Sequence, residues 1–167
     1  MLQYAILSIF PIIVVYAAFS DVLSMKISNK VSIVLFAAFF LLAPFVLGIK
    51  VIGWHVLTFA VVLGLTFGLF AAGLLGGGDA KLLAVIALWL GLESIGPYLF
   101  YVTIFGGALA VLFIGFRMLK LPERLKAQPW LARLHDQGQG IPYAVPLAAA
   151  ALVIYPQTPW VTSLIGG

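Results

Sequence analysis

The sequence is poor in charge and contains no cysteine. Only 8% of its 167 residues are Asp, Glu, Lys or Arg, whereas 64% are hydrophobic. An average soluble domain carries about 25% charged residues, so this chain has too few of them to cover the surface of a water-soluble fold. The composition therefore excludes a soluble enzyme, a nucleic-acid-binding domain and a disordered chain, and it predicts an integral membrane protein. The lack of cysteine excludes disulfides, thiolate metal sites and thiol nucleophiles.

Long apolar runs predict an all-α, polytopic membrane protein that forms a single domain over residues 1–167. A membrane-spanning helix needs about 20 mostly apolar residues. The fourth run covers only residues 82–92, so its helix must extend in both directions to approach a full crossing. The one long polar segment, 117–140, precedes the last helix. We therefore predict six transmembrane helices, with a short fourth one, over residues 2–20, 31–49, 51–75, 79–95, 98–116 and 141–160.

The cationic residues predict the orientation of these helices. With six spans, the connecting segments lie alternately on the two sides of the membrane, and Lys50 is the only Lys or Arg on one side. An excess of Lys and Arg marks the cytoplasmic side, so the first, third and fifth connections are expected there and both termini outside. The cytoplasmic side then receives Lys26, Lys30, Lys81, Arg117, Lys120, Arg124, Lys126 and Arg133.

Two of the five carboxylates, Asp21 and Asp79, adjoin predicted spans. Two full crossings separate them, so both are expected at the cytoplasmic boundary of the membrane. An ionisable residue at membrane depth is costly and indicates a functional site. The alternative is that each aspartate merely ends a helix at the interface, with Asp79 as an N-cap. Glu93, Glu123 and Asp136 are interpreted as ordinary interface or loop charges.

Two aspartates that meet have a specific chemistry. Like charges a few ångströms apart cannot both ionise easily, so the pair shares a proton. One carboxylate then acts as a general base on water, while the protonated partner polarises a scissile carbonyl. Such a site needs no metal and no cofactor, and neither histidine has a partner at metal-ligand spacing. The same pair could equally relay protons in a transporter.

Three consecutive glycines, Gly76, Gly77 and Gly78, precede Asp79. Glycine adopts backbone conformations closed to other residues, so we expect an irregular loop that a substrate backbone can approach closely; a simple helix break is the alternative. The spacing of a phosphate-binding loop is absent. Lys81 is expected on a different helix face from Asp79, where it holds the loop or reaches the lipid headgroups.

Several other polar and aromatic residues lie near the predicted span ends. Asn29 is expected to cap the second helix or to hydrogen-bond the loop that follows Asp21. His55 is interpreted as an interfacial residue near the outer end of the third span. Interfacial anchoring is also the interpretation for most of the four tryptophans, which are Trp54, Trp89, Trp130 and Trp160.

Taken together, these motifs resemble those of the type IV prepilin peptidases, a family of GxGD membrane aspartyl proteases. The stretch that ends in Asp79 matches the GxGD signature, and Lys81 completes the GxGDxK form. Asp21 matches the first catalytic aspartate of the family, and Ile-Ser-Asn at 27–29 is similar to its usual Ile-Pro-Asn. Ile-Pro-Tyr at 141–143 resembles the Pro-Tyr-Gly that opens the last helix, with Ala144 in place of glycine.

The resemblance implies an aspartic endopeptidase with Asp21 and Asp79 as the catalytic residues. It implies a prepilin or pseudopilin substrate with an N-terminal hydrophobic helix, cleaved at the cytoplasmic face of the bacterial inner membrane, with membrane lipids as the other partner. No nucleic acid, metal or cofactor is implied. The residues expected to form the substrate-binding loop are Gly76, Gly77, Gly78, Lys81 and Asn29.

The short, cysteine-free chain looks like the compact, CpaA/TadV-like form associated with Flp or tight-adherence pili. Larger bifunctional members of the family carry a zinc-binding insertion with cysteines and methylate the new N-terminus, so N-methyltransferase activity is not implied here. Three alternatives remain open. They are a GxGD protease acting on other membrane peptides, a small proton-coupled transporter or transporter subunit that uses Asp21 and Asp79 as a relay, and a structural subunit of a membrane complex.

Overall fold

The computed structural model describes residues 2–165, with only the backbone described at Leu2 and Lys126. This part of the chain is helical and contains no strand, in agreement with the predicted all-α class. The elements follow one another in the order α1 (Leu2–Ser24), α2 (Asn29–Val46), α3 (Ile49–Ala71), α4 (Gly77–Leu90), α5 (Leu92–Met118), α6 (Glu123–Lys126), α7 (Pro129–His135), α8 (Ala144–Ile154), η1 (Tyr155–Gln157) and α9 (Pro159–Ile165).

Four helices, α1, α2, α3 and α5, are long and apolar enough to cross a membrane. The stretch from α8 through η1, together with α9, makes a fifth candidate that is bent by 40° at a short break. Helix α4 has only 14 residues, which gives a length of about 21 Å against the roughly 30 Å of a hydrocarbon core. The chain is therefore a multi-pass membrane protein, while the count of six spans stays a prediction.

Helix α4 is short because glycines bound it at both ends. Gly76 is its N-cap, and Gly91 follows its last residue with a φ of 77°, a conformation that residues with a side chain rarely adopt. Every residue of α4 from Leu82 to Leu90 is buried, since α2, α3, α5 and α8 pack around it. A helix that is apolar on all sides is stable only when it is enclosed in this way.

Several predicted boundaries differ from the observed helix ends. The third span was expected to run to residue 75, but α3 ends at Ala71 and a turn follows. The fourth was expected to run to residue 95, but the break at Gly91 transfers Glu93 to the first turn of α5. The last predicted span, 141–160, is interrupted where η1 follows α8.

The aromatic core overturns part of the tryptophan interpretation. Trp89 and Trp160 are fully buried rather than interfacial. Their rings stack with centroids 4.5 Å apart, and the indole N–H of Trp89 donates to the carbonyl oxygen of Leu35 over 3.0 Å. Trp54 and Trp130, by contrast, are exposed.

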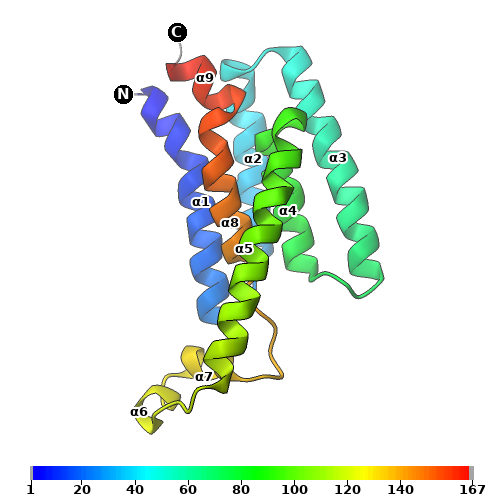
Figure 1. The fold of residues 1–167 in the computed structure, drawn as a ribbon. Helices are drawn as coiled ribbons and strands as arrows, with labels where there is room; N and C mark the ends of the chain where they lie inside the picture. Colours follow the sequence, from blue (N-terminus) through cyan, green and yellow to red (C-terminus); the bar gives the residue numbers. More distant parts are fainter. Residues whose placement is uncertain (1, 166–167) are drawn as a thin grey trace.

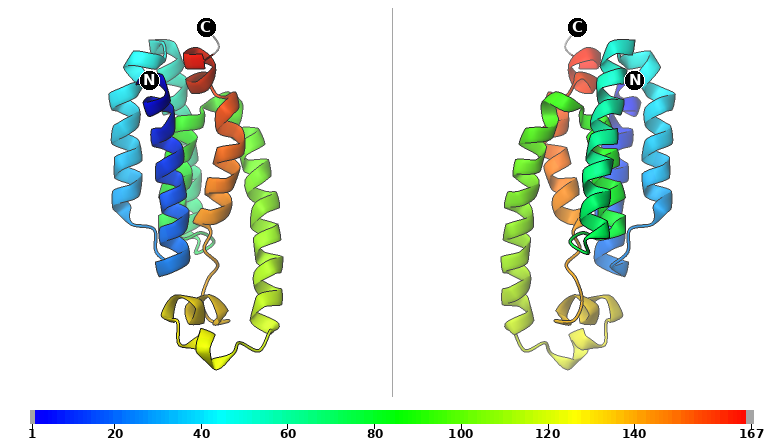
Figure 2. Two further views of the ribbon diagram at one scale, coloured as in Figure 1. Left: turned by 90° about the vertical axis from the view of Figure 1, so that its left-hand side faces the viewer. Right: turned by 90° about the vertical axis from the view of Figure 1, so that its right-hand side faces the viewer.

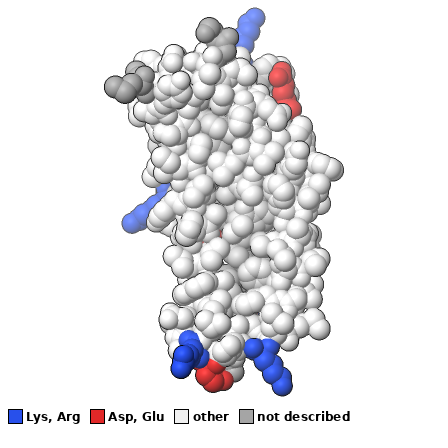
Figure 3. All heavy atoms as spheres, turned by 60° about the vertical axis from the view of Figure 1, so that its left-hand side comes forward, with Lys and Arg blue, Asp and Glu red and all other residues white. Residues whose placement is uncertain are grey.

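The two ends of the molecule differ. Both termini lie at one end of the helix bundle, and α6 and α7 lie beyond the opposite end (Figures 1 and 2). On the face shown in Figure 3, most charged side chains lie at the two ends, and one Lys or Arg side chain projects from the edge about halfway along the molecule. The uncharged surface between these charges is suited to contact with lipid.

Candidate active site

Asp21 lies in the last turn of α1 and is only 5% exposed. The helix ends at Ser24, because the next residue, Met25, has a positive φ of 54°. The N–H of Met25 donates to the carbonyl oxygen of Asp21 and completes the last turn. The backbone N–H of Ala144 donates to Oδ2 of Asp21 over 3.0 Å. Ala144 is the first residue of α8, and the first N–H groups of a helix have no partner within it. The start of α8 therefore supplies a donor that holds the Asp21 carboxylate in place.

Asp79 lies in the first turn of α4. A carboxylate at this position is stabilised by the partial positive charge of the helix N-terminus. The N-cap itself is Gly76, so the alternative in which Asp79 is merely an N-cap is wrong. No hydrogen bond to the Asp79 carboxylate is formed by any residue that the structure describes.

Asp21 and Asp79 line the same cavity, which has a volume of about 320 Å³ and is open to the surface. Both carboxylates therefore face one shared space. They are the only acidic residues that line the cavity among the residues described. The remaining walls come from the α1–α2 connection and from the glycine segment, through Met25, Lys26, Ile27, Gly76 and Gly78.

The glycines are required for space rather than for an unusual backbone. Gly76, Gly77 and Gly78 have no positive φ; within residues 2–165 the glycines that do are Gly73 and Gly91. The expected irregular loop is therefore wrong for Gly77 and Gly78, which belong to α4.

Each of the three glycines faces a close neighbour. A Cβ added to Gly76 would lie 2.6 Å from Oδ2 of Asp79, and one added to Gly77 would lie 3.1 Å from Cε2 of Phe70. A Cβ on Gly78 would lie 3.2 Å from Cβ of Ile27. The contact of Gly78 brings the glycine segment against the connection that follows Asp21, so it helps to hold the two carboxylates at one cavity.

Lys81 and Asn29 meet each other outside this cavity. The ammonium group of Lys81 donates to Oδ1 of Asn29 over 3.0 Å, which joins α4 to the start of α2. The expectation that Lys81 holds a loop therefore has a defined partner. The N-cap of α2 is Ser28, whose hydroxyl accepts from the N–H of Lys30, so the capping role expected for Asn29 is wrong.

Two arginines near the cavity end of α1 make contacts that the sequence does not predict. Arg133 in α7 donates to the carbonyl oxygen of Leu23 at the end of α1 over 2.7 Å. Arg117 in the last turn of α5 donates to three carbonyl oxygens of the segment that leads to α8. The sequence indicates both arginines only as topology signals, because a bond to a distant backbone carbonyl leaves no pattern in the sequence.

No group of three or more His, Asp or Glu side chains within residues 2–165 is arranged to hold a metal ion. His55 is packed against the protein, between α3 and α4, with 2% of its surface exposed, and its expected depth at the membrane interface stays a prediction. It lies at the opposite end of α3 from the glycine segment and takes no part in the aspartate cavity.

Comparison with known proteins places these features in a family. The model of the type IV leader peptidase family matches residues 8–115, which is about two thirds of the chain and includes Asp21 and Asp79. No curated protein and no solved structure gives a significant match. The family match agrees with the predicted resemblance and with the multi-pass helical fold, and it implies a protease. The chain belongs to the type IV leader peptidase family.

Proposed function

We propose that this protein is a membrane aspartic endopeptidase that removes the leader peptide from type IV prepilin-like substrates, with Asp21 and Asp79 as its catalytic pair. The observation that carries the proposal is that two carboxylates from distant parts of the sequence line one open cavity. Family membership supplies the reaction class.

The chemistry requires only water and the two carboxylates. The ionised carboxylate takes a proton from a water molecule, whose oxygen attacks the carbonyl carbon of the scissile peptide bond. The protonated carboxylate donates a hydrogen bond to the carbonyl oxygen as negative charge develops there. When the tetrahedral intermediate breaks down, the C–N bond is cleaved and the leaving amine takes up a proton. The N–H of Ala144 fixes one carboxylate of the pair during these steps.

The site is proposed to face the cytoplasm of the bacterial inner membrane, with both termini outside. The cavity lies at the end of α1, next to the α1–α2 connection that contains Lys26 and to the first turn of α2 that contains Lys30. Arg117 and Arg133 flank the same end. A prepilin presents a short cytoplasmic leader followed by a hydrophobic helix, so its scissile bond would reach this level of the membrane. The hydrophobic helix would remain in the lipid against this protein.

Flp-type prepilins are the proposed substrates, because the sequence resembles the CpaA/TadV-like members of the family. Cleavage without methylation is the activity proposed. The glycines are proposed to keep space for the Asp79 carboxylate, while the bond between Lys81 and Asn29 keeps α2 and α4 in register beside the site.

The proposal is tested with purified protein reconstituted in liposomes together with a candidate Flp prepilin. Asp21→Asn and Asp79→Asn should each lower the cleavage rate by roughly 10²–10⁴-fold or more, because removing a general acid or base costs that much. Asp136→Asn is the matched control, since Asp136 lies in the polar segment, where its carboxylate accepts from the N–H of Gly138. This variant should cleave the prepilin at the wild-type rate.

Full activity in either Asp21→Asn or Asp79→Asn would refute the catalytic pair. The transporter alternative is measured in the same liposomes with an internal pH indicator. A wild-type protein that cleaves no prepilin, but moves protons in a manner dependent on both aspartates, would replace the protease proposal by the transporter.

A further inference from the structure

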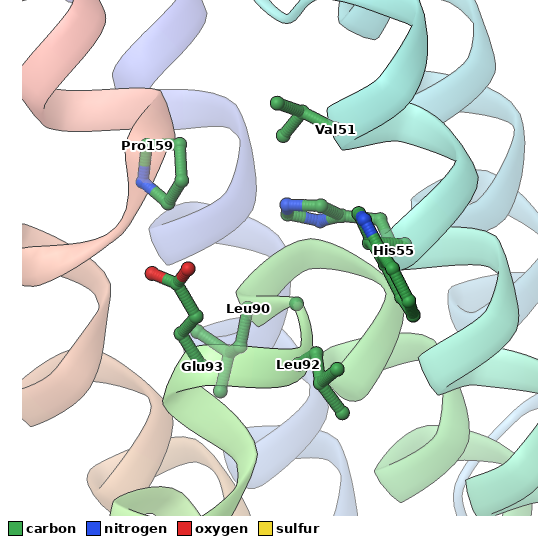
Figure 4. A pocket seen from close by; sticks show the side chains of 8 residues that line it. Val51, His55, Leu90, Leu92, Glu93 and Pro159 are labelled. Carbon is green, nitrogen blue, oxygen red and sulfur yellow. The ribbon is translucent and has the colours of Figure 1, made fainter.

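A second pocket lies at the end of the molecule opposite the aspartate cavity. It has a volume of about 190 Å³ and is formed where α3 begins, where α4 turns into α5, and where α9 begins. Val51, Trp54, His55, Glu93 and Pro159 are among its lining residues. Figure 4 shows His55 and Glu93 reaching it from different helices, His55 from α3 and Glu93 from the start of α5.

His55 brings an unpaired hydrogen-bond acceptor to this pocket. Its Nδ1 lies 2.7 Å from the carbonyl oxygen of Leu88; a carbonyl only accepts, so Nδ1 carries the hydrogen and Nε2 of the neutral ring is an acceptor. Nε2 forms no hydrogen bond with a residue that the structure describes. It points at Gly91 on the pocket wall, where an added Cβ would lie only 2.7 Å from it.

Glu93 adds a carboxylate beside this acceptor. It is exposed in the first turn of α5, and no described residue forms an ion pair with it. Glu93 and His55 line the same pocket, so a ligand in it can meet both groups. The pocket therefore combines a buried neutral acceptor with an unpaired negative charge.

Trp54 supplies the third feature. Its ring lines the pocket and is 56% exposed, at the beginning of a helix that crosses the membrane. Tryptophan favours the membrane–water interface, and the face of its ring attracts cations. The pocket thus lies at headgroup level, where it can be reached by lipids as well as by solutes.

We propose that this pocket binds a primary ammonium group, carried by the headgroup of a phospholipid such as phosphatidylethanolamine or by a free amine. An ammonium group has three N–H donors and no acceptor, which fits the Nε2 acceptor of His55 and the carboxylate of Glu93. Trp54 contributes a cation–π contact at the pocket mouth. A metal ion fits less well, because no third His, Asp or Glu stands beside the two among the described residues.

The proposal does not depend on the protease activity and is tested by binding. Purified protein in detergent is titrated with phosphatidylethanolamine and, separately, with phosphatidylcholine, and lipid-bound species are counted by native mass spectrometry. Phosphatidylethanolamine should bind more tightly, because a quaternary ammonium group cannot donate hydrogen bonds. Glu93→Gln should weaken its binding on the order of tenfold, as expected for a lost hydrogen bond to a charged group.

Two further variants localise the effect. Glu123→Gln makes the same chemical change at the opposite end of the molecule and should bind like the wild type. Val51→Phe keeps the charge but adds volume to the pocket wall, and it should also weaken binding. Thermal unfolding of each variant checks that the fold is retained.

Competition with free ethanolamine distinguishes a free amine from a lipid headgroup as the ligand. If ethanolamine displaces the lipid, the ammonium group alone is sufficient for binding to the pocket. A lack of competition, with the lipid still sensitive to Glu93→Gln, would assign the site to the whole headgroup. Equal binding of both lipids, unchanged binding in Glu93→Gln, or no binding of either probe would overturn the proposal.

Discussion

Gly76 leaves no room for a side chain beside one member of the proposed catalytic pair, Asp79. The position of its missing Cβ lies 2.6 Å from an Asp79 carboxylate oxygen, so any side chain there would push the carboxylate away. Its own backbone is ordinary, with φ of −67° and ψ of 140°. The glycine at the first position of the GxGD motif therefore leaves space for the carboxylate of Asp79, and a larger residue there would displace that carboxylate.

Gly76→Ala should therefore lower prepilin cleavage on the order of 100-fold, since a displacement of about 1 Å at a reacting group can cost that much. Loss of the glycine N-cap should cost at most about 1 kcal/mol of stability, so the protein should still fold. The measurement is the cleavage rate together with the thermal unfolding midpoint. Gly107→Ala in α5 is the control, because an added Cβ there meets nothing within 4 Å; if both variants cleave equally well, the steric argument fails.

Hydrogen bonds from Arg117, in the last turn of α5, hold the segment that leads to the start of α8. Arg117 donates from Nε to the carbonyl oxygen of Leu134 over 3.0 Å, and from Nη2 to those of Gln139 and Gly140 over 3.0 and 2.7 Å. The segment held in this way leads directly to Ala144, whose N–H holds Asp21. One guanidinium group therefore links the end of α5 to the helix start that positions the carboxylate.

Arg117→Lys should loosen this segment although it keeps the charge, because an ammonium group cannot reproduce the planar fork of guanidinium donors. The loss of bonds from a charged donor should lower stability by about 1–3 kcal/mol and speed proteolysis within residues 119–140. Limited proteolysis in detergent measures the rate of cutting. Arg124→Lys makes the same exchange in α6 and should be cut like the wild type; equal rates for all three proteins would contradict the linking role.

The charges of the whole molecule predict its orientation. Lys50 is the only Lys or Arg on the proposed outer side, whereas the others lie in the connections at the other end or in the helix turns next to them. On the face shown in Figure 3, most of the charged side chains lie toward the two ends of the molecule. Moving such charges across a membrane is costly, and the positive-inside bias gives the direction.

This orientation can be measured because the chain has no cysteine. A cysteine introduced as Lys50→Cys should react with a membrane-impermeant maleimide in intact cells. One introduced as Arg124→Cys should react only after the membrane is permeabilised. The reverse pattern would place the aspartate cavity on the outer face and would contradict the proposed cytoplasmic site.

The sequence by itself determined that this protein belongs in a membrane, that it is helical, and that Asp21 and Asp79 come to one side of it. These conclusions rest on the lengths of the apolar runs and on the number of membrane crossings between two residues. Neither quantity depends on how the helices pack. The motif around Asp79 and the position of Asp21 then indicated the family that the comparison confirmed.

Only the tertiary structure decided which apolar residues face protein and which face lipid. Hydropathy treats the two environments alike, so the sequence predicts interfacial positions for Trp89 and Trp160 although both are fully buried. The enclosure of α4, the contact of Gly76 with Asp79, and the bond from Ala144 to Asp21 all join residues that are brought together by the packing of helices. Such contacts depend on the distance between atoms in the folded chain, and no spacing along the sequence contains that distance.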